Sequence, residues 1–161
     1  MDLKSFLVSS LERSPGMLKM TVADMSDAEL NERPVEGANT PNWQIGHLIS
    51  AEASLFASIG MPKFALPAGF EEAYARPKPG VTPGKPFAKE QLVSLLEQVN
   101  AAAVAWARTL NDEQLAAPTA ERMRAIAPTT ADLINLITSH NAMHVGQIQV
   151  MRRKLGKPIL F

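Results

Sequence analysis

Cysteine is absent from the sequence, which excludes disulfide bonds, thiolate metal ligands and a cysteine nucleophile. A net charge is also absent, because sixteen basic residues balance sixteen acidic ones, and no overall field draws the chain to nucleic acid or to a membrane surface. Residues 1–14 lack the apolar core of a signal peptide, and no stretch approaches the roughly 20 apolar residues of a transmembrane helix. We therefore expect a cytoplasmic protein with neither a nucleic-acid nor a membrane partner.

The length and composition are those of a globular domain. The chain has 161 residues, of which 46% are hydrophobic and 20% are charged. A chain of this length can bury a continuous core. Residues 1–161 are therefore predicted to form a single domain.

Apolar residues recur at helical spacing in four long segments, residues 2–22, 41–59, 87–110 and 132–156. No segment shows a credible strand pattern, so the predicted fold is all-α, an antiparallel four-helix bundle. Pro15 and Gly16 interrupt the first segment. They predict a kinked helix, or two pieces with Ser14 capping the second.

Capping residues mark the ends of these segments. Thr40 followed by Pro41 predicts a helix start, and Thr129 or Thr130 is expected to cap the last helix. Gly156 is expected to end that helix. The three basic residues before it, Arg152, Arg153 and Lys154, are predicted to complement the helix dipole on a solvated surface.

Residues 61–86 hold six of the twelve prolines and three of the nine glycines, a density that predicts no regular element. The bundle then has one long proline-rich crossover loop between its second and third long helices. Long loops in compact domains are often functional. Two interpretations stay open: the loop forms a lid near the site, or it crosses one end of the bundle.

The chain has only three histidines, and all three fall on apolar helical segments. His140 and His144 are four residues apart, so one helical turn places their rings on one face. His47 lies on the second long helix. In a bundle, three imidazoles on two helices can hold one divalent ion with an open coordination position, which is typical of catalytic rather than structural sites. The alternative is three hydrogen-bonded core histidines without a metal.

Several polar and aromatic residues lie near the predicted ligands. Gln44 is one turn before His47 and Gln147 is one turn beyond His144, so each either orients a ligand or merely covers the edge of the site. Glu52 lies well over 100° from His47 around the helix axis, so we expect it to be solvated or to act from outside the metal's ligand shell. Trp43 is interpreted as a packing residue rather than a substrate platform.

The segments NWQIGHLISAE and SHNAMHVGQIQVMRRKLGKP together resemble the DinB/YfiT-like superfamily of metal-dependent enzymes. The resemblance covers nearly the whole chain, through the W-x-x-G-H-L and H-x-x-x-H-x-G-Q-I patterns. It implies an antiparallel bundle, often a homodimer, with a zinc- or nickel-like ion on His47, His140 and His144. It also implies a small-molecule substrate, because relatives include transferases and isomerases that use a low-molecular-weight thiol, and others described as hydrolases.

A divalent ion on neutral imidazoles favours the deprotonated form of whatever fills its open position. Zinc lowers the pKa of bound water from about 15.7 to roughly 7, and it makes a bound thiol a thiolate almost outright. Metal-bound water or a thiol is then the nucleophile. Where a helical zinc protease carries its glutamate after the first histidine, this chain has Asn141.

The missing base favours a thiol-dependent transferase or isomerase, with the thiol supplied by a cofactor because the chain has no cysteine. The alternatives are a metal-dependent hydrolase and a non-catalytic stress-response binding module with a vestigial metal site. Three imidazoles suit zinc, nickel, copper and iron alike, so zinc or nickel rests on the resemblance alone.

Overall fold

The computed structural model describes residues 2–76 and 84–161, and its four long helices form a bundle. They are α1 (Leu3–Val22), α3 (Pro41–Ala57), α5 (Lys89–Thr109) and α7 (Thr130–Lys154). Three short helices, α2 (Asp27–Leu30), α4 (Phe70–Tyr74) and α6 (Asp112–Ala116), and a 3-10 turn (Glu121–Met123) lie between them. The described residues contain no strand, so the predicted all-α fold is confirmed.

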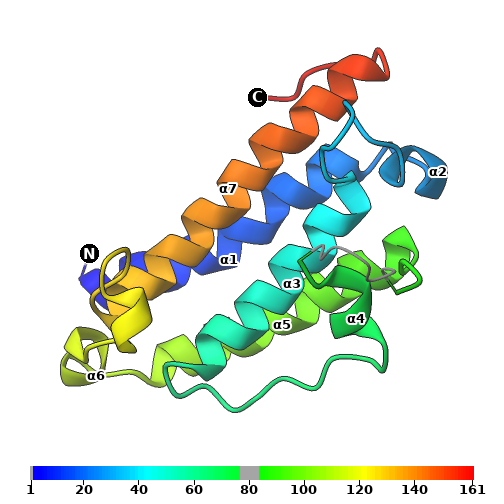
Figure 1. Ribbon diagram of the computed structural model, residues 1–161. Coiled ribbons are helices and arrows are strands. Elements are labelled where there is room, and N and C mark those ends of the chain that lie inside the picture. The colour runs from blue at the N-terminus through cyan, green and yellow to red at the C-terminus, as the bar shows by residue number, and fades with distance from the viewer. Residues whose placement is uncertain (1, 77–83) are drawn as a thin grey trace.

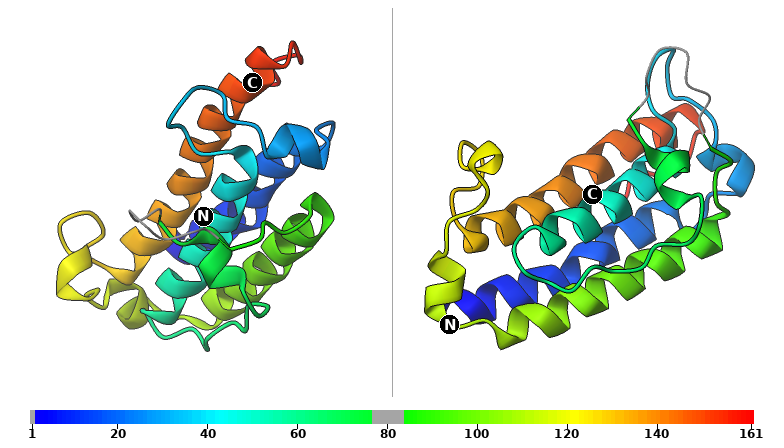
Figure 2. Two further views of the ribbon diagram at one scale, coloured as in Figure 1. Left: turned by 45° about the vertical axis from the view of Figure 1, so that its right-hand side comes forward. Right: turned by 60° about the horizontal axis from the view of Figure 1, so that its bottom comes forward.

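The helices run in two opposed pairs. Figure 1 shows α1 and α7 pointing one way, and α3 and α5 pointing the other way. Each of α1 and α3 packs against both α5 and α7, which makes the α1–α5 and α3–α7 neighbours antiparallel. Because α3 and α5 point the same way, the chain between them must travel back along the 17 residues of α3, about 25 Å. Residues 58–88 make that return, and Figure 2 shows the described part running beside the bundle.

The caps that the sequence predicts set the helix boundaries. The Thr40 hydroxyl accepts a hydrogen bond from the backbone N–H of Trp43, and Pro41 takes the first helical position. Thr129 caps α7 in a reciprocal arrangement with Asp132. Gly156, at a φ of 68°, ends that helix in a conformation that favours glycine.

The first helix is continuous through Pro15, so the prediction of two pieces capped by Ser14 is wrong. Proline has no N–H to donate to the carbonyl of Leu11 one turn earlier, which would leave that buried acceptor without a partner. Asn100 on α5 supplies the missing donor, with its Nδ2 atom 3.0 Å from the Leu11 oxygen. The Ser14 hydroxyl instead accepts from Asn141 Nδ2 on α7 at 2.6 Å. Both contacts tie α1 to its neighbours at the level of the proline.

The core is formed by apolar side chains that all four long helices direct inward. Its fully buried members include Leu11, Leu18, Ile45, Leu48, Ile49, Phe56, Leu92, Leu96, Val99, Leu133, Ile134, Ile148 and Met151. Removing this apolar surface from water is the main force that holds the helices together. Among the described residues, no helix is both long and apolar enough to cross a membrane.

Arg152 does not lie on a solvated surface, which corrects the sequence prediction for this part of the basic cluster. Its side chain is 1% exposed. The guanidinium donates to both carboxylate oxygens of Asp24 and to the backbone carbonyls of Thr21 and Pro158. A planar group with five donors suits such a set of acceptors, and it fixes the end of α7 against the end of α1.

The helix α4 interrupts the proline-rich segment, so the prediction of no regular element over residues 61–86 is wrong at this point. Gly69 precedes the helix at a φ of 79°, and the side chains of Phe70, Ala73 and Tyr74 are buried against α3. The high proline and glycine content of this segment could not reveal that three apolar residues are buried on one face of a short helix. The prediction that the loop forms a lid or crosses one end of the bundle includes residues 77–83, which lie outside the described residues.

Tyr74 docks α4 onto the start of α3. Its hydroxyl accepts from the backbone N–H of Phe87 at 2.8 Å and donates to Asn42 Oδ1 at 3.0 Å, while Asn42 Nδ2 donates to the Phe87 carbonyl at 2.8 Å. The Tyr74 ring lies directly on the backbone of α3 at Gly46, where a Cβ atom would overlap it. The glycine that precedes His47 is therefore required by packing.

Substituting Gly46 tests this docking. Alanine has the better helix propensity by about 1 kcal/mol, but the overlap with Tyr74 should reverse the sign and make Gly46→Ala destabilising by about 1–3 kcal/mol. Gly146→Ala is the matched control, since a Cβ there meets no atom within 4 Å and should be neutral or stabilising. Urea denaturation measures both; equal stability of the two variants would contradict the docking.

Candidate metal centre

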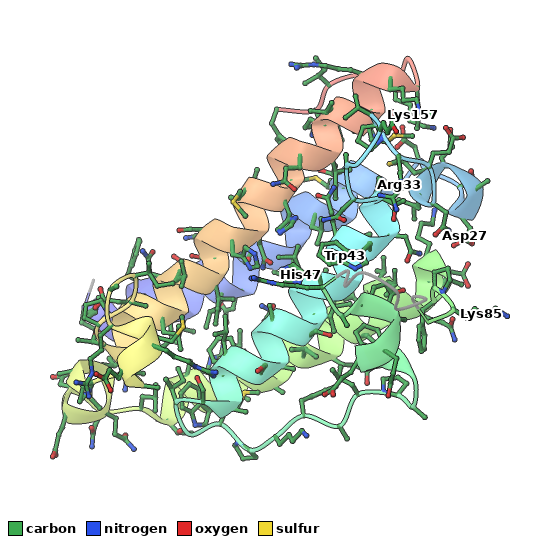
Figure 3. The ribbon with its side chains drawn as sticks, viewed as in Figure 1. Asp27, Arg33, Trp43, His47, Lys85 and Lys157 are labelled. Carbon is green, nitrogen blue, oxygen red and sulfur yellow. The ribbon has the colours of Figure 1, made fainter. Side chains whose placement is uncertain are left out.

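The three histidines converge between α3 and α7, two antiparallel helices from opposite halves of the chain. His47 is on the middle of α3, and His140 and His144 lie one turn apart on the middle of α7. Figure 3 labels His47 on α3, where that helix runs beside α7. The side chains of His47 and His140 are partly exposed, whereas His144 is 5% exposed. The cluster therefore has a buried side at His144 and an open side at the other two rings.

The spacing of the ring nitrogens suits a single ion. One nitrogen from each histidine lies within 4.8 Å of the others, and the Nε2 atoms of His140 and His144 are 3.2 Å apart. Three nitrogens placed 2.0–2.1 Å from a tetrahedral ion would be about 3.4 Å apart. The pair on α7 is close to this spacing, and bringing the His47 nitrogen from at most 4.8 Å to about 3.4 Å needs a shift of no more than about 1.5 Å. Among the described residues, this is the only group of three such side chains that meets.

Gln44 fixes which nitrogen of His144 carries the proton. The Gln44 amide nitrogen donates to the backbone carbonyl of Asn39 at 3.2 Å, so its Oε1 atom faces the histidine and accepts from Nδ1–H at 3.1 Å. The Nε2 atom of His144 then keeps a lone pair, directed at His140. A hydrogen bond to the far nitrogen of a ligand ring is the usual way in which proteins orient metal-binding histidines.

Trp43 holds the His47 ring. The indole stacks on the imidazole with centroids 4.9 Å apart and planes 4° from parallel. Its own orientation is set by Nε1–H, which donates to the carbonyl of Ala75 at 3.2 Å. Trp43 is thus a packing residue, as expected, and the ring against which it packs is a predicted ligand.

All three imidazoles are held neutral, the form that binds a metal. Burial lowers the pKa of His47, His140 and His144, and neighbouring positive charge lowers each pKa further. For His144 the pKa falls to about 4. At neutral pH the cluster therefore presents lone pairs rather than protons.

The two glutamines predicted near the ligands have different places in the structure. Gln44 is 3% exposed and touches His144, as described above. Gln147 is exposed, and no hydrogen bond among the described contacts joins it to a histidine. The helical step from His144 places it toward solvent.

Glu52 is buried in the core with 1% exposure, so the expectation of a solvated carboxylate is wrong. It lies five residues after His47, about 140° around the helix, and that direction is covered by the bundle. Its Oε1 atom is 3.5 Å from Asn100 Nδ2, and Oε2 has no hydrogen-bond partner. Burial raises the pKa of this carboxyl to about 7, although hydrogen bonds from Asn100 and Asn141 lower it.

The sequence offered only weak signals for several of these residues. Asn100 and Asn141 are polar residues at positions of helical apolar stripes, which is a signal for a buried polar cluster. The stacking of Trp43 follows from its place one turn before His47 on the same helix, which also put Gln44 near the predicted site. The hydrogen bond that Gln44 accepts from His144 depends on the packing of α3 against α7. Nothing local predicted the contact of Trp43 with Ala75.

The fold and the cluster define the class: a four-helix bundle with three convergent, neutral imidazoles on two of its helices. A sequence model described as the DinB superfamily matches residues 10–148. The chain belongs to this superfamily.

Two solved structures share the fold. YfiT from Bacillus subtilis, described as a probable metal-dependent hydrolase with an unusual four-helix bundle topology, is 22% identical, with a TM-score of 0.72 over 96% of this chain and 89% of its own. A conserved protein from Enterococcus faecalis is 18% identical, with a TM-score of 0.73 over 98% of this chain and 99% of its own. The comparison with curated proteins gave no match.

The buried carboxyl of Glu52 predicts a pH dependence of stability. With a pKa of about 7 when folded against 4.5 as the ordinary value, the folded chain keeps a proton that the unfolded chain releases. The free energy of unfolding should therefore fall as the pH rises from about 4.5 to 7, by roughly 3 kcal/mol. Glu52→Gln removes this pH-dependent contribution to stability, because glutamine does not titrate.

Urea denaturation of the metal-free protein between pH 5 and 8 measures the effect. The stability of Glu52→Gln relative to the unsubstituted protein should increase as the pH rises from 5 to about 7 and then level off. A difference between the two proteins that stays constant across this range would contradict burial of the carboxyl without a compensating positive charge.

Proposed function

We propose that this protein is a metal-dependent enzyme that holds one divalent ion on His47, His140 and His144. The observation that carries the proposal is the convergence of three neutral imidazoles, one of them oriented through its far nitrogen by Gln44. The description of YfiT as a probable metal-dependent hydrolase supports the same class of function. An ion held in this way supplies Lewis acidity at an open position, which favours the deprotonated form of a thiol or of water.

The residues around the cluster favour a thiol as the nucleophile. Among the described residues, no carboxylate contributes to the pKa shifts of the three rings. Asn141, at the position where a zinc protease has its general base, is 3% exposed and donates to Ser14. A thiol starts from a pKa of about 8.5, far below that of water, and so needs less help in losing its proton. The proposed reaction is transfer or isomerisation with a low-molecular-weight thiol as cosubstrate.

A hydrolase is the second candidate. It is favoured by the description of YfiT, whose structure superimposes on nearly all of this chain. In this chain the base would have to come from outside the histidine cluster. The carboxyl of Glu52 is turned into the core and engaged by Asn100.

Elemental analysis tests the metal site. Protein prepared without a nickel-affinity step should bind about one equivalent of zinc or nickel, and His140→Ala should lose it because two imidazoles cannot replace three. Gln44→Ala should weaken the affinity about 10–100-fold, since the far nitrogen of His144 loses its acceptor. Gln147→Ala is the matched control and should retain the full metal affinity. Equal metal content in all four proteins would refute the site.

Cobalt loading separates the two reactions. The Co²⁺ protein should show a sulfur-to-metal absorption band with 2-mercaptoethanol, and it should transfer that thiol to an electrophilic acceptor, while His140→Ala does neither. Ester or amide hydrolysis at an undiminished rate without any thiol, together with no such band, would favour the hydrolase instead.

A further inference from the structure

Arg76 stands at the rim of the histidine cluster. The residue before it, Ala75, accepts the hydrogen bond from Trp43 Nε1–H at 3.2 Å, and Trp43 stacks on His47. The backbone next to Arg76 is therefore held close to His47, with only the indole of Trp43 between them. The Arg76 side chain itself is exposed.

The positive charge of Arg76 acts on the open side of the cluster. It lowers the pKa of His47 and of His140, the two partly exposed rings, but it is not among the causes that lower the pKa of buried His144. Together with the contact of Ala75 with Trp43, this electrostatic effect places the Arg76 charge beside the two open rings.

No acidic partner neutralises this guanidinium among the described residues. Arg76 takes part in none of the five ion pairs that they form. The remaining residues, 1 and 77–83, contain no aspartate or glutamate. The Arg76 charge is therefore not cancelled by a local ion pair, although the whole chain has a net charge of zero.

From this geometry we infer that Arg76 is an anion-binding residue of the site, and that the ligand entering it carries a carboxylate remote from its metal-binding atom. The planar guanidinium matches a carboxylate in a two-point hydrogen-bonded pair. If a bound ion held the sulfur of such a thiol, Arg76 would be the residue available to bind its carboxylate. The inference rests on the proposed function and adds one property to it, that the thiol substrate is negatively charged.

Three thiols that differ only in the remote group test this inference on the Co²⁺-loaded full chain. They are 3-mercaptopropionate with a negative end, 2-mercaptoethanol with a neutral end and cysteamine with a positive end. Titration of the sulfur-to-cobalt band gives the dissociation constant of each. The anionic thiol should bind about three- to tenfold more tightly than the neutral one, and the cationic thiol should bind most weakly.

Variants separate Arg76 from chelation of the metal by the carboxylate. Arg76→Gln should bring the ratio of the anionic to the neutral constant close to one, and Arg76→Lys should leave an intermediate ratio, since it keeps the charge but not the planar group. Arg122→Gln, exposed on the 3-10 turn, is the matched control and should keep the preference of the unsubstituted protein.

The outcomes distinguish this inference from the proposed function. If the unsubstituted protein binds the three thiols equally, or if Arg76→Gln and Arg76→Lys keep its preference, the role of Arg76 is refuted while thiol binding at the metal stands. If none of the three thiols produces the band, the proposed thiol chemistry fails and the inference fails with it.

Discussion

The convergence of three neutral imidazoles between α3 and α7 is the constraint on which the rest of this structure depends. Burial lowers the pKa values of the rings below the ordinary 6.5 and so keeps them neutral, and convergent rings need two helices in a fixed register. Both requirements are met by burial of His144 and by its hydrogen bond to Gln44, whose own amide nitrogen donates to Asn39. A change that loosens the packing of α3 on α7 would affect the protonation of the rings and their spacing together.

The segment that follows α3 supports this register from outside the bundle. Tyr74 packs on the backbone at Gly46 and is bonded to Asn42, while Ala75 holds the indole of Trp43 against His47. The connection between the parallel helices α3 and α5 thereby also positions His47, one of the three predicted ligands. It also brings Arg76 to the rim, so one short stretch of chain links the fold, the orientation of His47 and the charge at the mouth of the site.

Much of this could be predicted from the sequence, because the relevant signals are local. The caps at Thr40 and Thr129 and the glycine at 156 give the helix ends, and the four-residue step from His140 to His144 gives one half of the cluster. What could not be predicted depends on partners distant in the chain. Pro15 does not break α1, because Asn100 supplies a donor from 85 residues away, and Arg152 is buried because Asp24 and Thr21 meet it. The position of Arg76 depends in turn on the contact between Trp43 and Ala75.

X-ray absorption at the metal edge of the loaded protein tests the central claim most directly, because it counts and measures the atoms bound to the ion. We predict three imidazole nitrogens at about 2.0–2.1 Å and one further light ligand, replaced by a sulfur at about 2.3 Å when a thiol is added. A first shell with fewer than three imidazoles, or one made only of water and carboxylate oxygens, would contradict the account. The bundle would then be a fold whose three histidines serve packing alone.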